Sequence, residues 1–169
     1  MVAAIRITSK GGQEIERRLA RFVAANEDID PLLSGFGLYL ESSTIERFEF
    51  ERAPDGSRWK PSIRAKTEGG KTLYKSPGGL RDSITHLVHS RSVEVGTNKI
   101  YAGVHQHGAT IRAKNGGYLA FRLPGGLGFR KVKEVEIPAR PFLGLSGEDE
   151  TELLALTEDY EREALGGAA

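Results

Sequence analysis

The sequence has no cysteine among its 169 residues. Disulfides, thiolate metal sites and cysteine nucleophiles are therefore excluded, and a reducing compartment fits the composition. Long apolar runs are also missing. No stretch approaches the roughly 18 residues that a membrane-spanning helix needs, and the apolar run near the first residue is too short for a secretory signal. We therefore expect a soluble protein without membrane contact.

An excess of charge of one sign is absent from the chain as a whole, because 24 Lys and Arg balance 23 Asp and Glu to a net charge of +1. The charges are nevertheless unevenly placed. Residues 58–91 hold eight basic side chains against two acidic ones, whereas residues 147–169 hold eight acidic ones against one basic one. This separation suits head-to-tail contact between identical subunits, or a basic face towards nucleic acid. Two solvated faces of different charge would give the same pattern.

Apolar periodicity predicts a helical N-terminal part over residues 13–51, inside a single domain that spans residues 1–169. Residues 13–25 are expected to form an amphipathic helix. A second helix of roughly twenty residues is expected to follow, with Asp30 as its N-cap and Pro31 at its first position.

A C-terminal helix is predicted over residues 147–165. Ser146 has the character of an N-cap, and Asp149 stands three residues on, which is the spacing of a capping box. Acidic residues crowd the first turn, where the helix dipole favours negative charge. This helix is expected to pack on the core by one apolar face.

Period-two alternation over residues 84–89 and 92–96, on either side of a two-residue turn, predicts an antiparallel hairpin. A short helical turn follows and ends at Gly108. Its spacing predicts that three side chains press against the strand, namely Tyr101, Val104 and His105.

A third strand is predicted over residues 109–113, and a long hairpin over residues 118–137 with a glycine-rich tip at residues 124–128. The return strand carries several basic side chains. The hairpin is interpreted either as a docking arm or as a plain extension of the sheet. The predicted fold class is α+β: a small antiparallel sheet with N-terminal helices, a long β-hairpin arm and a C-terminal helix.

The segment 62–79 is polar, basic and glycine-bearing, and it shows no period. We interpret it as a basic flexible loop that is mobile or depends on a partner for order. Just before it, Trp59 is expected to anchor the chain to the core. Basic side chains here could contact DNA weakly and without sequence preference, although a solvated loop is the alternative. The candidates for contact with DNA or a partner are Arg58, Lys60, Arg64, Lys66, Lys71 and Lys75.

Catalytic and metal-binding motifs are not supported by their spacing. His105 and His107 are two residues apart and so diverge on a helical turn, which argues against a metal site with the other two histidines. The segment 69–72 reads Gly-Gly-Lys-Thr but lacks the earlier glycine of a phosphate loop. Ser146 lacks the glycines of a nucleophile elbow. No enzyme activity, metal or cofactor is predicted.

Four segments occur in an order that resembles the phage virion morphogenesis family, the tail-completion proteins of Mu-like and P2-like phages. They are APDGSRWKP (53–61), GGLRDSI (78–84), VGT with YAGVHQHG (95–108) and IPARPFLGLS (137–146). In the last, two prolines hold Arg140 in extended chain. Residues 76–79 depart from the family pattern.

The resemblance implies a structural virion protein of the tail or neck, assembled in the bacterial host cytoplasm, that completes the tail and joins it to the head. Its expected partners are further copies in a ring, tail tube or terminator proteins, and head connector proteins. His105 is expected to pack under Tyr101, and Gln106 to bond backbone. The residues implied in structure or assembly are Trp59, Arg81, Tyr101, His105, Gln106, Arg140 and Phe142.

Overall fold

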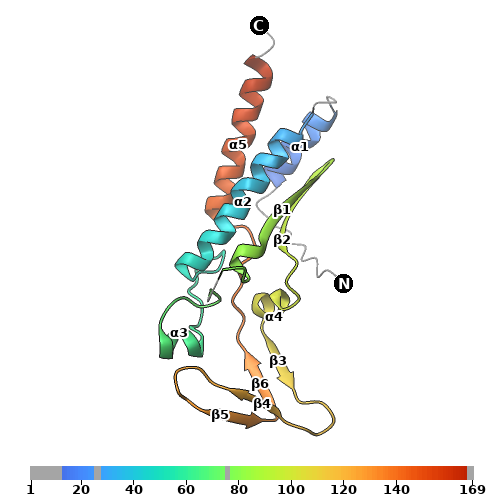
Figure 1. The fold of residues 1–169 in the computed structure, drawn as a ribbon. Helices are drawn as coiled ribbons and strands as arrows, with labels where there is room; N and C mark the ends of the chain where they lie inside the picture. The colour runs from blue at the N-terminus through green and yellow to red at the C-terminus, as the bar shows by residue number, and fades with distance from the viewer. Residues whose placement is uncertain (1–12, 25–27, 75–76, 167–169) are drawn as a thin grey trace.

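The structure is a computed structural model that describes residues 13–24, 28–74 and 77–166 (Figure 1). Three helices lie together in one half of the molecule: α1 (Gln13–Ala24), α2 (Asp30–Phe50) and α5 (Gly147–Gly166). α5 contacts both α1 and α2. The predicted α+β class, with a C-terminal helix and a β-hairpin, is confirmed. The single small sheet is replaced by three separate two-stranded antiparallel sheets.

The start of α2 differs from the prediction by one residue. Ile29 occupies the N-cap position without a side-chain bond, and Asp30 is already the first helical residue, so Asp30 is not the N-cap. The carboxylate of Asp28 accepts the Asp30 amide at 3.0 Å instead. Because Asp28 supplies this oxygen and Pro31 has a backbone preset for the first turn, the helix can begin earlier.

The predicted hairpin around residues 90–91 is confirmed. β1 (Ile84–His89) pairs antiparallel with β2 (Ser92–Thr97), with His89 opposite Ser92. α2 crosses this hairpin closely at Gly37, where an added Cβ would lie 2.3 Å from the His86 ring. The absence of a side chain at Gly37 therefore lets the helix reach the hairpin.

The predicted long hairpin over residues 118–137 is only partly correct. β4 (Leu119–Arg122) pairs with β5 (Phe129–Val132), but the pairing ends there. β6 (Glu134–Ile137) pairs instead with β3 (Ala109–Arg112). The β4–β5 hairpin is thus nested inside the β3–β6 pair, and the two make up the arm at the lower end of the molecule in Figure 1. Strand partners depend on tertiary context, which alternation alone does not contain.

The segment predicted as a loop without regular structure contains a short helix, α3 (Ile63–Glu68). The Ser62 hydroxyl accepts the Ala65 amide at 3.1 Å and caps it. Thr72, later in the same segment, is fully buried, and its hydroxyl accepts the Ser62 amide at 3.2 Å. Local side-chain bonds of this kind order a polar segment that has no apolar period.

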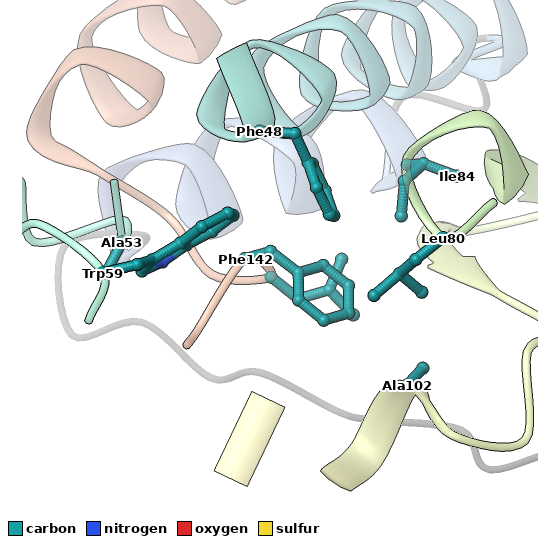
Figure 2. Packing of buried hydrophobic residues seen from close by; sticks show 8 residues of the cluster. Phe48, Ala53, Trp59, Leu80, Ile84, Ala102 and Phe142 are labelled. Carbon is teal, nitrogen blue, oxygen red and sulfur yellow. The ribbon is translucent and has the colours of Figure 1, made fainter. Parts of the chain in front are cut away.

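The main core lies where α2, the β1–β2 hairpin, α4 (Ala102–His107) and the chain before α5 meet. Figure 2 shows its side chains converging from these elements. The Phe48 ring centroid lies 5.3 Å from those of both Trp59 and Phe142. The expected anchoring of Trp59 is therefore present, and its indole Nε1 donates to the Pro141 carbonyl at 2.8 Å. The cluster comprises Phe48, Ala53, Trp59, Leu80, Ile84, Ala102, Phe142 and Leu143.

A second cluster joins the long helices to one another. It contains Ile15 of α1, Leu33 and Phe36 of α2, and Leu153 of α5. Within the described helices, no segment is long and apolar enough to cross a membrane. The buried apolar side chains of these helices pack against one another and against Val93 of the β1–β2 hairpin, whereas Leu38 and Phe50 of α2 are exposed.

Candidate functional site

Two of the segments that carry the family resemblance, residues 95–108 and 137–146, fold against each other together with the strands that adjoin them. β3 pairs with β6 from Ala109 opposite Ile137 to Arg112 opposite Glu134. Beyond this pair, the Arg140 amide donates to the His105 carbonyl at 2.7 Å. The segment before α5 is therefore held along the side of α4, and the last helix starts from a fixed point.

Gln106 makes the central connection through its side-chain amide. Its Oε1 accepts the backbone amides of Phe142 and Leu143, both at 3.0 Å. Its Nε2 donates to the Leu143 carbonyl at 2.8 Å. All three bonds are buried. The Gln106 side chain therefore satisfies backbone groups of the 142–143 segment, as a neighbouring β-strand would do elsewhere. The backbone bonding expected of Gln106 is present.

α4 turns a different face to the core from the one predicted. Ala102 and Gln106, one turn apart, are the buried side chains. Tyr101 is 43% exposed and so does not press against the strand as expected. The reason is that the Gln106 side chain makes three hydrogen bonds in the interior. Ala102, four residues earlier, lies on the same face of the helix and is buried with it. Tyr101 and His105 do contact each other, with ring centroids 6.0 Å apart.

His105 and Arg140 lie together at the edge of this junction. Arg140 is nearly buried, and its Nε donates to the Lys60 carbonyl at 2.7 Å, which ties in the chain after Trp59. The Nδ1 of His105 is buried and has no hydrogen-bond partner among the described residues. Burial first, and the Arg140 charge second, lower the pKa of His105. The imidazole is therefore held neutral, which suits packing rather than proton transfer near pH 7.

Sequence reasoning missed the buried ion pair between Arg47 of α2 and Asp149 of α5. Arg47 also donates to the carbonyls of Phe142 at 2.8 Å and Gly144 at 2.9 Å. Burial lowers the pKa of Arg47, and the Asp149 charge opposes this shift. Burial and the Asp149 charge raise the pKa of Tyr39 to about 12. The only sequence signal was an arginine on the apolar side of α2, next to Phe48.

Half of the six basic candidates for contact with DNA or a partner are exposed: Arg58, Lys60 and Lys66. Arg64 instead donates to carbonyls of its own loop, including that of Tyr74 at 2.9 Å. The Lys71 ammonium lies 3.0 Å from the Glu49 carboxylate. Lys75 lies outside the described residues. Of the five described candidates, Arg64 and Lys71 are therefore engaged within the subunit, whereas the other three are exposed.

Arg81 links the segment before β1 to α2. Its guanidinium pairs with Glu49 and, at 2.7 Å, with Asp82. It also lies 3.8 Å from the centre of the Tyr74 ring. Hydrogen bonds from Lys71 and Arg81 lower the pKa of the Glu49 carboxyl. Arg81 thus acts within the subunit, where it holds the end of α2 to the following loop.

The described residues contain no group of three or more His, Asp or Glu side chains placed to hold a metal ion. The sequence-predicted structural residues divide by location. Trp59, Gln106, Arg140 and Phe142 meet around the junction between α4 and the chain before α5, with His105 at its edge. Tyr101 is on the surface beside His105. What this arrangement can do is fix three remote chain segments in one rigid body.

Comparisons with known proteins identify a family for this chain. The model of the phage virion morphogenesis family matches residues 11–160. The chain is 31% identical over 156 residues to the Mu-like prophage FluMu G protein 2 of Haemophilus influenzae, which covers 92% of this chain and 95% of that protein. No solved structure matches the chain. These matches indicate a structural role in phage morphogenesis, and the chain belongs to the phage virion morphogenesis family.

Proposed function

We propose that this protein completes the phage tail and makes it competent to join the head. It acts at the head-proximal end of the tail, in the tail or neck of the virion, after assembly in the bacterial cytoplasm. It works by protein–protein contacts in a ring and has no catalytic step. The observation that carries the proposal is the family match over residues 11–160, which includes every motif of the sequence resemblance.

The rigidity of the subunit supports this proposal. Gln106 ties α4 to Phe142, Arg140 ties the same segment to Lys60, and Arg47 ties it to α2. These bonds bring together parts of the chain that lie up to 97 positions apart in sequence. A subunit that must repeat around a ring needs a fixed relation between its contact surfaces, and buried hydrogen-bond networks supply it.

The partners that we propose are further copies of the chain, tail tube or terminator proteins, and head connector proteins. The alternative, a non-enzymatic nucleic-acid-binding module that uses residues 58–91, finds less support. Arg64 and Lys71 are engaged within the subunit, whereas Arg58, Lys60, Lys66 and Arg91 are exposed. These few exposed cations would give weak binding to DNA that falls with salt.

Deletion of the gene from the phage or prophage that carries it tests the proposal. We expect electron micrographs of the lysate to show DNA-filled heads and separate, full-length tails. A plasmid copy of the gene should restore joined particles. Normal joined particles after deletion, or heads that lack DNA, would contradict a role in tail completion.

A further inference from the structure

The β4–β5 hairpin has one face on which every side chain is exposed. The strand register places Ala120 opposite Lys131 and Arg122 opposite Phe129, and side chains in directly opposite positions share a face. Tyr118, just before β4, adjoins this face because its ring contacts Lys131, and the exposed Lys133 follows β5 directly. We call it the hairpin face, and it consists of Tyr118, Ala120, Arg122, Phe129, Lys131 and Lys133.

The hairpin face combines positive charge with exposed aromatic rings. Tyr118 is 53% and Phe129 61% exposed. The Lys131 ammonium lies 4.5 Å from the centre of the Tyr118 ring. No acidic residue occurs between positions 113 and 133. Aromatic rings among cations on one small surface are typical of a docking site and are a poor use of a merely solvated surface.

The hairpin is held in a fixed position by α3. The Gly125 amide at its tip donates to the Glu68 carboxylate at 2.8 Å. An added Cβ at Gly125 would lie 2.3 Å from Thr67, so the tip and α3 are in close contact. On the other face of the hairpin, Leu119, Phe121 and Val132 are partly buried. The hairpin face is thus presented outward in a defined orientation.

A surface of opposite charge lies on α5. Glu148, Glu152, Asp159 and Glu163 are exposed and follow the spacing i, i+4, i+11 and i+15. At about 100° per residue, these four carboxylates fall within an arc of about 60°. They extend over about 22 Å of helix, away from the buried Leu153. We call them the α5 stripe; one of them, Asp159, also pairs with Arg162 at 2.8 Å.

The hairpin face and the α5 stripe belong to opposite parts of the molecule. Figure 1 shows the β4–β5 hairpin at one end, while α5 leads to the other. The hairpin therefore cannot cover the stripe of its own chain. Contact between two different surfaces of identical subunits is head to tail, and it repeats until it closes into a ring or continues as a stack.

We propose that the hairpin face docks on the α5 stripe of a second copy of this chain. The inference rests on the proposed function, because it supplies the subunit contact that a ring needs. It also replaces residues 58–91 as the basic partner surface, since Arg64 and Lys71 are engaged within the subunit. A second copy fits better than nucleic acid because the chain carries its own complementary surface and its net charge is only +1.

Two neutralised variants test this contact. The hairpin variant carries Arg122→Gln, Lys131→Gln and Lys133→Gln, and the stripe variant carries Glu148→Gln, Glu152→Gln and Glu163→Gln. All six positions are exposed, so both variants are expected to fold. We expect the wild type to associate at low salt in sedimentation velocity, and each variant alone to associate at least about tenfold more weakly.

A mixture of the two variants gives the sharper result. In the mixture, the intact hairpin face of the stripe variant can still bind the intact α5 stripe of the hairpin variant, but no other contact is possible. The mixture should therefore form a one-to-one complex and grow no further. A control variant carries Arg21→Gln, Arg52→Gln and Arg91→Gln, which removes three exposed cations outside the arm. It should associate as the wild type does. A wild type that does not associate, or variants that associate as it does, would overturn the proposal.

Titration with duplex DNA tests whether the hairpin face binds nucleic acid instead of a second copy. If the hairpin variant loses DNA binding while its self-association is unchanged, the face binds nucleic acid and the proposal is wrong. Complementation of the gene deletion separates this inference from the proposed function. A hairpin variant that restores joined particles fully would refute the contact but leave tail completion intact. A deletion without a joining defect would refute tail completion, whereas the contact in solution would still be measured independently.

Discussion

The Gln106 side chain makes three buried hydrogen bonds, and its removal should destabilise the fold. Gln106→Ala leaves the amides of Phe142 and Leu143 without an acceptor in the core. We expect the free energy of unfolding to fall by about 2–4 kcal/mol, measured by urea denaturation. His107→Ala, on the exposed side of the same helix, should change it by less than about 0.5 kcal/mol. Equal effects at the two positions would mean that these bonds do not hold the junction.

The stability of the fold should also depend on the protonation of His105. Burial, and then the Arg140 charge, lower the pKa of His105 below its ordinary 6.5. The unfolded chain therefore binds a proton at His105 more readily than the folded chain does. The contribution of His105 to stability is fully present above about pH 6.5. It is lost as pH falls from there towards the lower pKa of the folded state.

Urea denaturation across this pH range tests the assignment. His105→Phe should lose less stability than the wild type as pH falls, because the variant cannot take up this proton. His107→Phe, the same substitution at an exposed position of α4, serves as the matched control. If the pH dependence of His105→Phe equals that of the wild type, the buried imidazole contributes nothing to acid stability.

Individual residues could be predicted from the sequence where local signals were strong. Trp59 after a Pro-Asp-Gly turn was expected in the core and is there. Ser146 and Asp149 form the expected capping box, with bonds of 2.7 and 3.1 Å. The pairing of Asp149 with Arg47, 102 positions away, could not be predicted, because nothing local to either residue indicates the other. Long-range polar partners are fixed by the fold, and a single sequence does not contain them.

Among the secondary-structure elements, the contact between α2 and the β1–β2 hairpin allows a matched pair of substitutions. Gly37→Ala would place a Cβ 2.3 Å from the His86 ring, whereas at Gly35 an added Cβ meets nothing within 4 Å. We expect Gly37→Ala to destabilise the fold by about 1–3 kcal/mol through overpacking. Gly35→Ala should stabilise it by about 0.5–1 kcal/mol, because alanine favours the helix.

Thermal unfolding of both variants measures these effects. Opposite shifts of Tm are expected, downward for Gly37→Ala and upward for Gly35→Ala. A Gly37→Ala protein as stable as Gly35→Ala would show that the helix does not approach the hairpin as closely as described.

The elements themselves were largely predictable, but two of their arrangements were not. The long helices and the β1–β2 hairpin follow from periodicity and turn residues. The pairing of β6 with β3 does not, because residues 118–137 alternate as if they were one continuous hairpin. α3 was missed since it has no buried residue and is set by the Ser62 cap. Both errors concern segments whose structure is set by a strand partner or a capping side chain rather than by apolar periodicity.

At the scale of the whole molecule, surfaces of opposite charge lie at opposite ends, which favours head-to-tail contact between copies. The acidic residues of the C-terminal region lie on α5, and the arm at the other end carries a basic face. The charge separation is visible in the sequence, which offers two cationic surfaces for a partner, residues 58–91 and the hairpin arm. We favour the hairpin as the partner surface, because Arg64, Lys71 and Arg81 of the other region are engaged within the subunit.

Cryo-electron microscopy of tails assembled with this protein tests the central claim most directly, namely that rigid copies assemble at the head-proximal end of the tail. We predict density for a closed ring of copies at that end, with each β4–β5 hairpin on the α5 helix of its neighbour. Absence of the protein from that end, or its presence only elsewhere on the particle, would contradict the account.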